Sequence, residues 1–247
     1  MPRIYLSPST QDWNPYVDGS GSEEYWMNLL ADTLEPYLYA NTISFARNTP
    51  EMTAASSIAQ ANSLVGFDFY LALHSNASGE EQVGKNRGII VFYYPTSSDG
   101  KRAAELFAAQ LRMVYPLPAK VTTQATTTLG EVRRPRYPAN LIELGYHDNY
   151  DDARWIENNL DAAAQAIARG LTEYFGLPFI YPQLVRTGVV TTEGSALRLR
   201  SYPGIDGETV GSIPNGESVQ VYGSYQGWYS VGYDGRLGYA AQAYIAV

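Results

Sequence analysis

The chain changes its sequence pattern once, near Gly176, and this change constrains the fold more than any other feature. Before Gly176, short apolar runs alternate with longer segments whose apolar residues recur at helical spacing. Such an alternation is typical of a parallel or mostly parallel sheet with helices on both faces. We therefore predict an α/β domain over residues 1–176. Its strands are expected at residues 4–6, 43–46, 67–73, 88–93 and 141–144, and its helices at about 22–38, 53–64, 99–115 and within 151–175.

After Gly176 the chain carries two closely spaced prolines, Pro178 and Pro182, and we interpret residues 177–187 as a linker. The remaining residues form short alternating segments such as 218–223 and 228–233, and Asp234-Gly235 follows the second of these. An Asp-Gly pair beside alternating residues predicts a tight β-hairpin. Short strands with tight turns over about 60 residues predict a small all-β barrel at residues 188–247.

Composition excludes several classes of partner and of chemistry. The chain has 17 Lys and Arg against 25 Asp and Glu, and neither part offers the positive field that duplex nucleic acid favours. The absence of cysteine excludes disulfides, thiolate metal ligands and a cysteine nucleophile. No apolar stretch approaches the roughly 20 residues that a membrane span needs, so we expect no membrane partner. The N-terminus also lacks the apolar core of a signal peptide. We therefore expect that a chain acting outside the cell is trimmed, exported by another route or released by lysis.

Both histidines of the chain follow apolar runs. His74 ends the run that starts at Phe69, and His147 follows the run that starts at Leu141 and contains Glu143. Open α/β sheets build their sites at the carboxyl ends of their strands. A histidine and a carboxylate there can hold zinc while a second carboxylate activates the bound water. We therefore expect His74 and Glu143 to meet at one sheet edge, together with Glu24 from the start of the first long helix.

Each candidate also has a purely structural explanation. His74 alone would fit a hydrogen-bonded core histidine, and His147 would fit a turn cap beside Asp148 and Asn149. Acidic residues such as Glu24 are common in the first turn of a helix because they complement its dipole, and Glu23 competes for any role. The apolar run before His74 and the Ser-Asn after it nevertheless favour a ligand role. A function is also favoured for Glu143, because a carboxylate inside a buried strand is costly unless it is paired or coordinated.

The tail resembles a bacterial SH3-like domain over its whole length. Residues 187–204 look like the opening of such a domain, and 211–217, 227–231 and 238–242 continue the resemblance in order. The resemblance implies binding to the bacterial cell wall. Seven tyrosines and one tryptophan lie between Val189 and Val247, and most of them are expected to fill or fringe the barrel. Trp228 is expected to be structural, and the candidates for surface binding are Tyr202, Tyr225 and Tyr233.

The first 176 residues resemble the zinc-dependent N-acetylmuramoyl-L-alanine amidases of the type-three family. Residues 4–9 match the opening strand and turn, and 24–28 match the glutamate that starts the first long helix. Residues 71–76, Leu-Ala-Leu-His-Ser-Asn, match the family's histidine strand, and 133–149 match its arginine-to-glutamate block. The resemblance implies a Zn²⁺ cofactor, peptidoglycan as the substrate and specific roles for individual residues. It implies that Glu24 and His74 are zinc ligands, that Glu143 is the catalytic carboxylate and that Arg133 contacts the substrate or the transition state. Asn76 and Arg134, beside these motifs, are further candidates for substrate binding.

One departure from the family pattern concerns the metal. The family places its first histidine ligand in the turn after strand one, where this chain has Ser-Pro-Ser-Thr-Gln at residues 7–11. His147 is one replacement, and an oxygen of Gln11 or Asp12 is another. Zinc prefers imidazole nitrogen to a neutral amide, so His147 is the better candidate. A weak or absent metal site is the third possibility.

The sequence therefore predicts a two-domain peptidoglycan hydrolase. It would cleave the amide between N-acetylmuramic acid and L-alanine of the stem peptide, as an autolysin or a phage endolysin, and act outside the cell or at the cell wall. The alternative is a catalytically degenerate wall-binding protein that lost its first zinc ligand. A peptidase acting within the stem peptide is a third reading. The stem-peptide chemistry, the origin and the oligomeric state stay open.

Overall fold

The computed structural model describes all 247 residues, and the chain divides into two compact units. One unit comprises Arg3–Leu34 and Phe45–Tyr174, and the other comprises Met1–Pro2, Glu35–Ser44 and Phe175–Val247. The C-terminal part of the first long helix therefore belongs to the second unit. The domain boundaries expected at residues 176 and 187 stay predictions. None of the helices is both long and apolar enough to cross a membrane.

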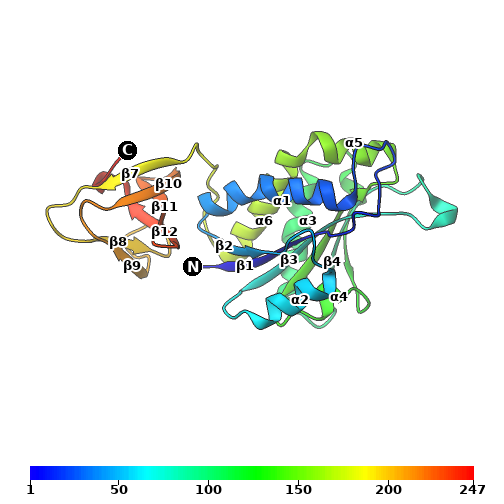
Figure 1. Cartoon of the computed structure of the whole chain (residues 1–247), viewed down its shortest axis with the longest axis horizontal. Helices are drawn as coiled ribbons and strands as arrows, with labels where there is room; N and C mark the ends of the chain where they lie inside the picture. The colour runs from blue at the N-terminus through cyan, green and yellow to red at the C-terminus, as the bar shows by residue number, and fades with distance from the viewer. The chain divides into compact units, whose positions relative to one another are not determined.

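The first unit is built on a six-stranded sheet with the strand order β2-β1-β3-β6-β4-β5 (Figure 1). The pairs β1–β3, β3–β6 and β4–β5 are parallel, and β4 runs antiparallel to β6. The predicted α/β class with a mostly parallel sheet is confirmed. The strands are β1 (Arg3–Pro8), β2 (Ser44–Arg47), β3 (Phe69–Asn76), β4 (Ile89–Tyr93), β5 (Val121–Ala125) and β6 (Ala139–Tyr146). The α-helices are α1 (Glu23–Ala40), α2 (Ala54–Ser63), α3 (Ser98–Arg112), α4 (Gly130–Arg133), α5 (Tyr150–Asn158) and α6 (Leu160–Phe175).

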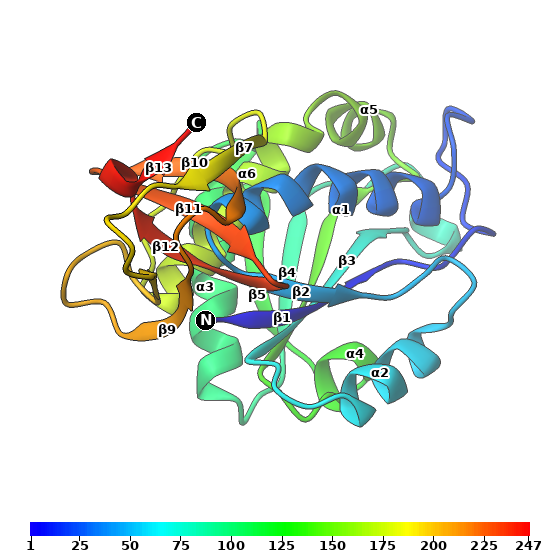
Figure 2. The ribbon, with the colours of Figure 1, turned by 60° about the vertical axis from the view of Figure 1, so that its left-hand side comes forward.

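Helices cover both faces of this sheet because its central strands are apolar on both sides. Tyr70 of β3 belongs to a buried cluster with Ile58 of α2 and Val132 of α4. The neighbouring Phe69 packs instead against Phe107 of α3 and Tyr174 of α6. Figure 2 shows α2 and α4 together on one side of the sheet and α1, α5 and α6 on the other. Successive side chains of a strand point to opposite faces, so this alternation fixes the face of every later residue in β3.

Two elements of the first unit, β5 and α4, are not predicted by the sequence pattern. Strand β5 is an edge strand in which only Val121 is buried, so it has no apolar run. Helix α4 is a single turn of four residues, Gly130–Arg133, which is too short to show a helical period. Its position matters, because it supplies Glu131 to the buried face of the sheet.

The second unit contains a separate seven-stranded sheet with the order β13-β7-β10-β11-β12-β8-β9. All of its described strand pairs are antiparallel, and the predicted Asp234-Gly235 turn joins β11 to β12, with Tyr233 paired to Arg236. Its core is a single apolar cluster that includes Val190, Leu199 and Val221. The strands are β7 (Arg186–Val190), β8 (Leu197–Arg200), β9 (Thr209–Ile213), β10 (Ser218–Tyr225), β11 (Trp228–Tyr233), β12 (Arg236–Ala241) and β13 (Ile245–Ala246). Three 3₁₀ turns complete the chain, at Glu80–Gln82, Pro118–Lys120 and Gln242–Tyr244.

Candidate active site

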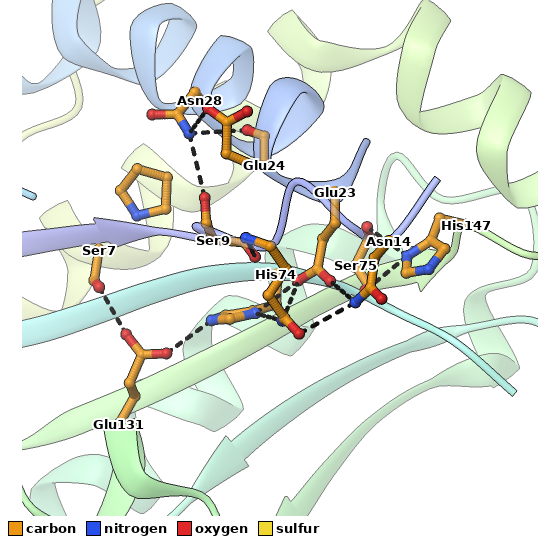
Figure 3. A network of polar contacts seen from close by, with 12 residues as sticks. Ser7, Ser9, Asn14, Glu23, Glu24, Asn28, His74, Ser75, Glu131 and His147 are labelled. Atoms are coloured by element: carbon orange, nitrogen blue, oxygen red, sulfur yellow. Dashed lines mark hydrogen bonds and ion pairs between the residues drawn. The ribbon is translucent and has the colours of Figure 1, made fainter. Parts of the chain in front are cut away.

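His74 lies between two carboxylates at the carboxyl end of β3 (Figure 3). Its Nδ1 is 2.7 Å from Oε1 of Glu23, and its Nε2 is 2.8 Å from Oε2 of Glu131. Burial by itself would lower the pKa of His74, but the charges and hydrogen bonds of Glu131 and Glu23 outweigh it and raise the pKa well above its usual value. Both ring nitrogens therefore carry hydrogen, and the residue is a buried imidazolium held by two ion pairs.

Glu23 reaches this cluster from the first turn of α1. Its Oε1 also accepts a hydrogen bond from the Gln11 side-chain amide at 3.2 Å, and its Oε2 accepts one from Asn14 at 2.9 Å. Burial would raise the pKa of Glu23, but the hydrogen bond and charge of His74 dominate and lower the pKa. Glu23 is thus held ionised by His74 of β3 and by two side-chain amides of the loop after β1.

Glu131 approaches His74 from the opposite side of the ring. Its Oε1 accepts hydrogen bonds from the hydroxyls of Ser7, at 2.6 Å, and Tyr70, at 2.8 Å. Burial opposes ionisation, yet the positive charge of His74 and these hydrogen bonds lower the pKa of Glu131. Ser7, Tyr70 and His74 come from adjacent strands, so the face that packs on α2 and α4 also builds the anchor of Glu131.

Glu143 differs from the other two carboxylates because its charge has no partner. It is the in-register neighbour of His74 in the β3–β6 pair, and its Oε2 is enclosed without any hydrogen bond. Burial raises the pKa of Glu143 to about 7; the charge of His74 lowers it, and those of Glu23 and Glu131 raise it. A carboxyl group that titrates near neutral pH can accept and return a proton, which is what a general acid–base catalyst needs.

A cavity of about 230 Å³ opens on this cluster. His74 and Glu131 line it together with the loop after β1 and the start of α2 at Thr53. Trp13 also lines the cavity, and its side chain is largely exposed. His74 and Glu131 are therefore reachable from solvent past an exposed indole ring, whereas Glu143, with its Oε2 enclosed, does not line the cavity.

Comparison with known proteins assigns this unit. The sequence model described as N-acetylmuramoyl-L-alanine amidase matches residues 16–173, more than half of the chain. The chain belongs to the N-acetylmuramoyl-L-alanine amidase family. A second model, described as bacterial SH3 domain, matches residues 195–246. Both resemblances that the motifs predicted are confirmed, and membership of this family supports peptidoglycan amidase function. No curated protein matches the chain in sequence.

Solved structures with the amidase fold are similar over most of the chain. N-acetylmuramoyl-L-alanine amidase AmiC2 of Nostoc punctiforme is 17% identical with a TM-score of 0.62, over 71% of this chain and 97% of that one. The CwlD amidase from Clostridioides difficile, solved with the GerS lipoprotein, is 16% identical with a TM-score of 0.62, over 71% and 99%. The catalytic domain of CwlV from Bacillus (Paenibacillus) polymyxa is 19% identical with a TM-score of 0.58, over 71% and 99%. At these identities the likeness establishes the fold of the amidase domain.

Of the two acidic residues that begin α1, Glu23 and not Glu24 contacts His74 in the amidase centre. The side chain of Glu24 accepts a hydrogen bond from Asn28 at 3.2 Å, and burial, followed by the charges of Asp12 and Glu51, raises its pKa. The sequence pattern favours Glu24 and leaves Glu23 only as a competitor for the same role. Adjacent positions of a helix point about 100° apart, so the choice between them depends on the exact entry angle of α1.

The amidase domain holds His147 away from His74. Its Nδ1 lies 2.9 Å from the backbone oxygen and 3.0 Å from the hydroxyl of Ser75, and its ring stacks on Tyr16 at 5.4 Å between centroids. Ser75 follows His74 in β3, so the two side chains leave opposite faces of the strand. A register shift after His74, where Gly145 adopts a φ of 110°, carries the chain of β6 to this second face.

The remaining predicted contacts lie outside the His74 cluster. Arg133 and Arg134 are exposed at the end of α4, and neither lines the cavity. Asn76 accepts the backbone N–H of His147 through its own carbonyl. In the SH3 domain, Tyr202 is exposed, whereas Tyr225 and Tyr233 pack partly against buried clusters. Their roles in substrate binding stay predictions.

Glu131 is the member of the cluster that sequence reasoning missed. It lies 57 residues from its partner His74, within the one-turn helix that the sequence pattern did not indicate. The available signal was an acidic residue followed by Val132 in an otherwise polar stretch, two residues before the predicted Arg133. That signal is common on protein surfaces, so only the packing of α4 on the sheet distinguishes Glu131.

The donors of the amidase centre do not fit the zinc that the resemblance implies. A zinc site needs at least three protein donors with free lone pairs, and no group of three or more His, Asp or Glu side chains is arranged to hold a metal. Both nitrogens of His74 face carboxylates. Gln11, which lies in the turn where the family has its first histidine, directs its amide nitrogen toward Glu23. Asp12, the other oxygen candidate, is exposed. Zinc dependence stays a prediction of the resemblance, which this donor arrangement does not support.

Proposed function

We propose that the chain hydrolyses the amide between the lactyl group of N-acetylmuramic acid and L-alanine of the stem peptide, and acts at the bacterial cell wall. Family membership supports the reaction class, and the unpaired Glu143 beside the His74 ion pairs is the observation that carries the chemistry. The SH3 domain would hold the enzyme near its polymeric substrate and so raise the local concentration of cleavable bonds.

In this proposal Glu143 moves the proton. As a carboxylate it takes a proton from water while the water oxygen adds to the amide carbon. It then returns the proton to the alanine nitrogen as the carbon–nitrogen bond breaks, which leaves a lactyl carboxylate and a free amine. A pKa of about 7 leaves both forms of Glu143 populated at neutral pH.

His74 supplies a fixed positive charge beside the reacting groups. Its two N–H groups are occupied by Glu23 and Glu131, so it acts through charge and not as a hydrogen-bond donor to substrate. Because two ionised carboxylates flank the imidazolium, the three residues together carry a net negative charge. Beside the larger effect of burial, they act on the pKa of Glu143, which the imidazolium lowers and the two carboxylates raise. Glu23 and Glu131 also act as positioning residues for the imidazolium.

The test is digestion of purified cell wall by the full-length chain, with mass spectrometry of the released fragments. Amidase activity leaves intact muramic lactyl groups and stem peptides that begin with a free alanine amine. Cleavage within the stem would indicate a peptidase instead. No cleavage of several wall types, with wall pelleting retained, would favour the degenerate wall-binding protein. Metal analysis of the same preparation tests zinc, and from the donor arrangement we expect well below one metal per chain.

A further inference from the structure

The SH3 domain carries a groove that is separate from the amidase centre. It has a volume of about 840 Å³ and is formed by residues 191–193 and 195–198, Arg200, Ile205, Trp228, and Ala241, Ala243 and Tyr244. Volumes of this order accommodate a ligand of several residues. None of the three tyrosines that the sequence suggested for binding lines this groove.

Two arginines give the groove its charge. Arg198 is exposed on β8, and no acidic side chain pairs with it. Arg200, two residues further on the same strand, donates a hydrogen bond to the backbone oxygen of Gly207 at 2.6 Å, and its guanidinium lies 5.9 Å from the centre of the Trp228 ring. Arg200 is therefore oriented in advance while several of its five N–H donors stay available. A guanidinium in this state is suited to bind a carboxylate.

The remaining lining gives the groove apolar surface and one negative charge. Ile205 and Tyr244 are exposed large side chains, and Trp228 in the same lining is half-buried. Glu193 contributes the only acidic side chain of the lining. A ligand that matches this surface carries carboxylates, an aliphatic portion and a single amine. Neutral sugar rings would use the aromatic surface but would leave both arginines without partners.

We propose that this groove binds the stem peptide of the wall, with the free carboxylates of the peptide on Arg198 and Arg200 and its aliphatic portion on Trp228. The inference rests on the proposed function in taking the wall as the target, and it assigns the recognised part to the peptide and not to the glycan. The groove would then bind the same stem peptide that the amidase domain releases from the glycan.

The experiment follows two tryptophan indole N–H signals in the full-length chain by NMR during titration with a synthetic stem tetrapeptide. Trp228 reports binding in the groove, and Trp13 reports binding in the amidase cavity. Because the stem peptide is also a product of the proposed reaction, the two signals distinguish binding at the groove from product binding at the amidase centre. Trp228→Phe assigns the groove signal. We expect the tetrapeptide to shift the Trp228 signal with saturation, and Arg198→Gln to weaken that binding by about tenfold or more.

Matched controls separate charge recognition from non-specific attraction. Arg186→Gln removes the same charge from an exposed position on β7 outside the groove and should leave the affinity unchanged. The same tetrapeptide with its carboxylates converted to amides loses its pairing with both arginines and should bind the parent at least as weakly as the charged peptide binds Arg198→Gln. Equal binding of the amidated and charged peptides overturns the proposal, as does a Trp228 shift produced by peptide-free glycan alone. Because no turnover is measured, a chain that binds peptide at Trp228 but cleaves no wall refutes only the amidase proposal.

Discussion

The surroundings of His74 and of His147 form a natural comparison. Both histidines are buried at the end of the paired strands β3 and β6, with exposed fractions of 8% and 3%. His74 meets two carboxylates, whereas His147 meets the hydroxyl and carbonyl of Ser75 and the ring of Tyr16. The two sites lie on opposite faces of the same strand pair. Similar burial and strand position thus place one histidine between two carboxylates and the other in a hydrogen-bonded packing site.

The largest expected effect is on turnover at the His74 side. Glu143→Gln keeps the shape of the side chain but removes the proton acceptor, so we expect the rate of wall cleavage to fall by about 10² to 10⁴-fold. Release of muropeptide fragments by the full-length variant measures the effect. Ser75→Ala, on the His147 side, is the matched control and should retain turnover. A Glu143→Gln variant with parental rates would remove Glu143 from the mechanism.

The next effect concerns stability and again singles out the charged site. Glu131→Ala leaves the imidazolium of His74 with only one of its two carboxylates and leaves the hydroxyls of Ser7 and Tyr70 without an acceptor. Breaking a buried ion pair in this way costs about 3–5 kcal/mol of unfolding free energy. Denaturant titration at neutral pH measures it. If Glu131→Ala were no less stable than Ser75→Ala, the two histidine sites would not differ in the way that the geometry indicates.

A third prediction uses the pH dependence of stability. The folded-state pKa of Glu143, about 7, lies above its ordinary value of 4.5, so the folded state holds this proton more tightly than the unfolded chain does. The parent therefore loses stability as pH rises from about 4.5 through 7. Glu143→Gln lacks this loss, and its stability relative to the parent should grow by about 3 kcal/mol across that window.

Denaturant titrations of parent and variant at a series of pH values test this. The difference between the two proteins reports the titration of Glu143 together with its electrostatic coupling to His74. A difference that stays constant from pH 4 to pH 8 would contradict the raised pKa of Glu143.

The smallest effect is expected at the His147 site. Ser75→Ala removes two hydrogen bonds, one donated by the hydroxyl of Tyr16 and one with Nδ1 of His147, and should cost about 2 kcal/mol of unfolding free energy. His147→Gln, which retains hydrogen-bonding capacity, should leave wall cleavage and metal content unchanged, because His147 faces Ser75 and not the His74 cluster. A parallel loss of bound zinc and of activity in His147→Gln would restore His147 as the replacement for the family's missing histidine.

The sequence by itself determined the architecture and the location of the centre. Apolar runs that end in His74 and contain Glu143 place both residues in central strands, and neighbouring parallel strands bring them into register. The all-β fold of the C-terminal domain was predictable for the same reason, because the Asp234-Gly235 turn and the alternating segments depend on residues close together in the chain. Local propensity and side-chain periodicity are encoded within a few residues, so they can be read without the fold.

Only the tertiary structure decided which groups surround each histidine. Glu23 and Glu131 reach His74 across 51 and 57 residues of sequence, and the choice of Glu23 over Glu24 depends on the angle at which α1 meets the sheet. The register shift at Gly145 places His147 on the face of the sheet where Ser75 lies, and no local sequence pattern predicts this shift. The groove of the SH3 domain likewise gathers Arg198, Trp228 and Tyr244 from separate segments. Contacts of this kind depend on the relative orientation of whole elements, which packing fixes only after the chain has folded.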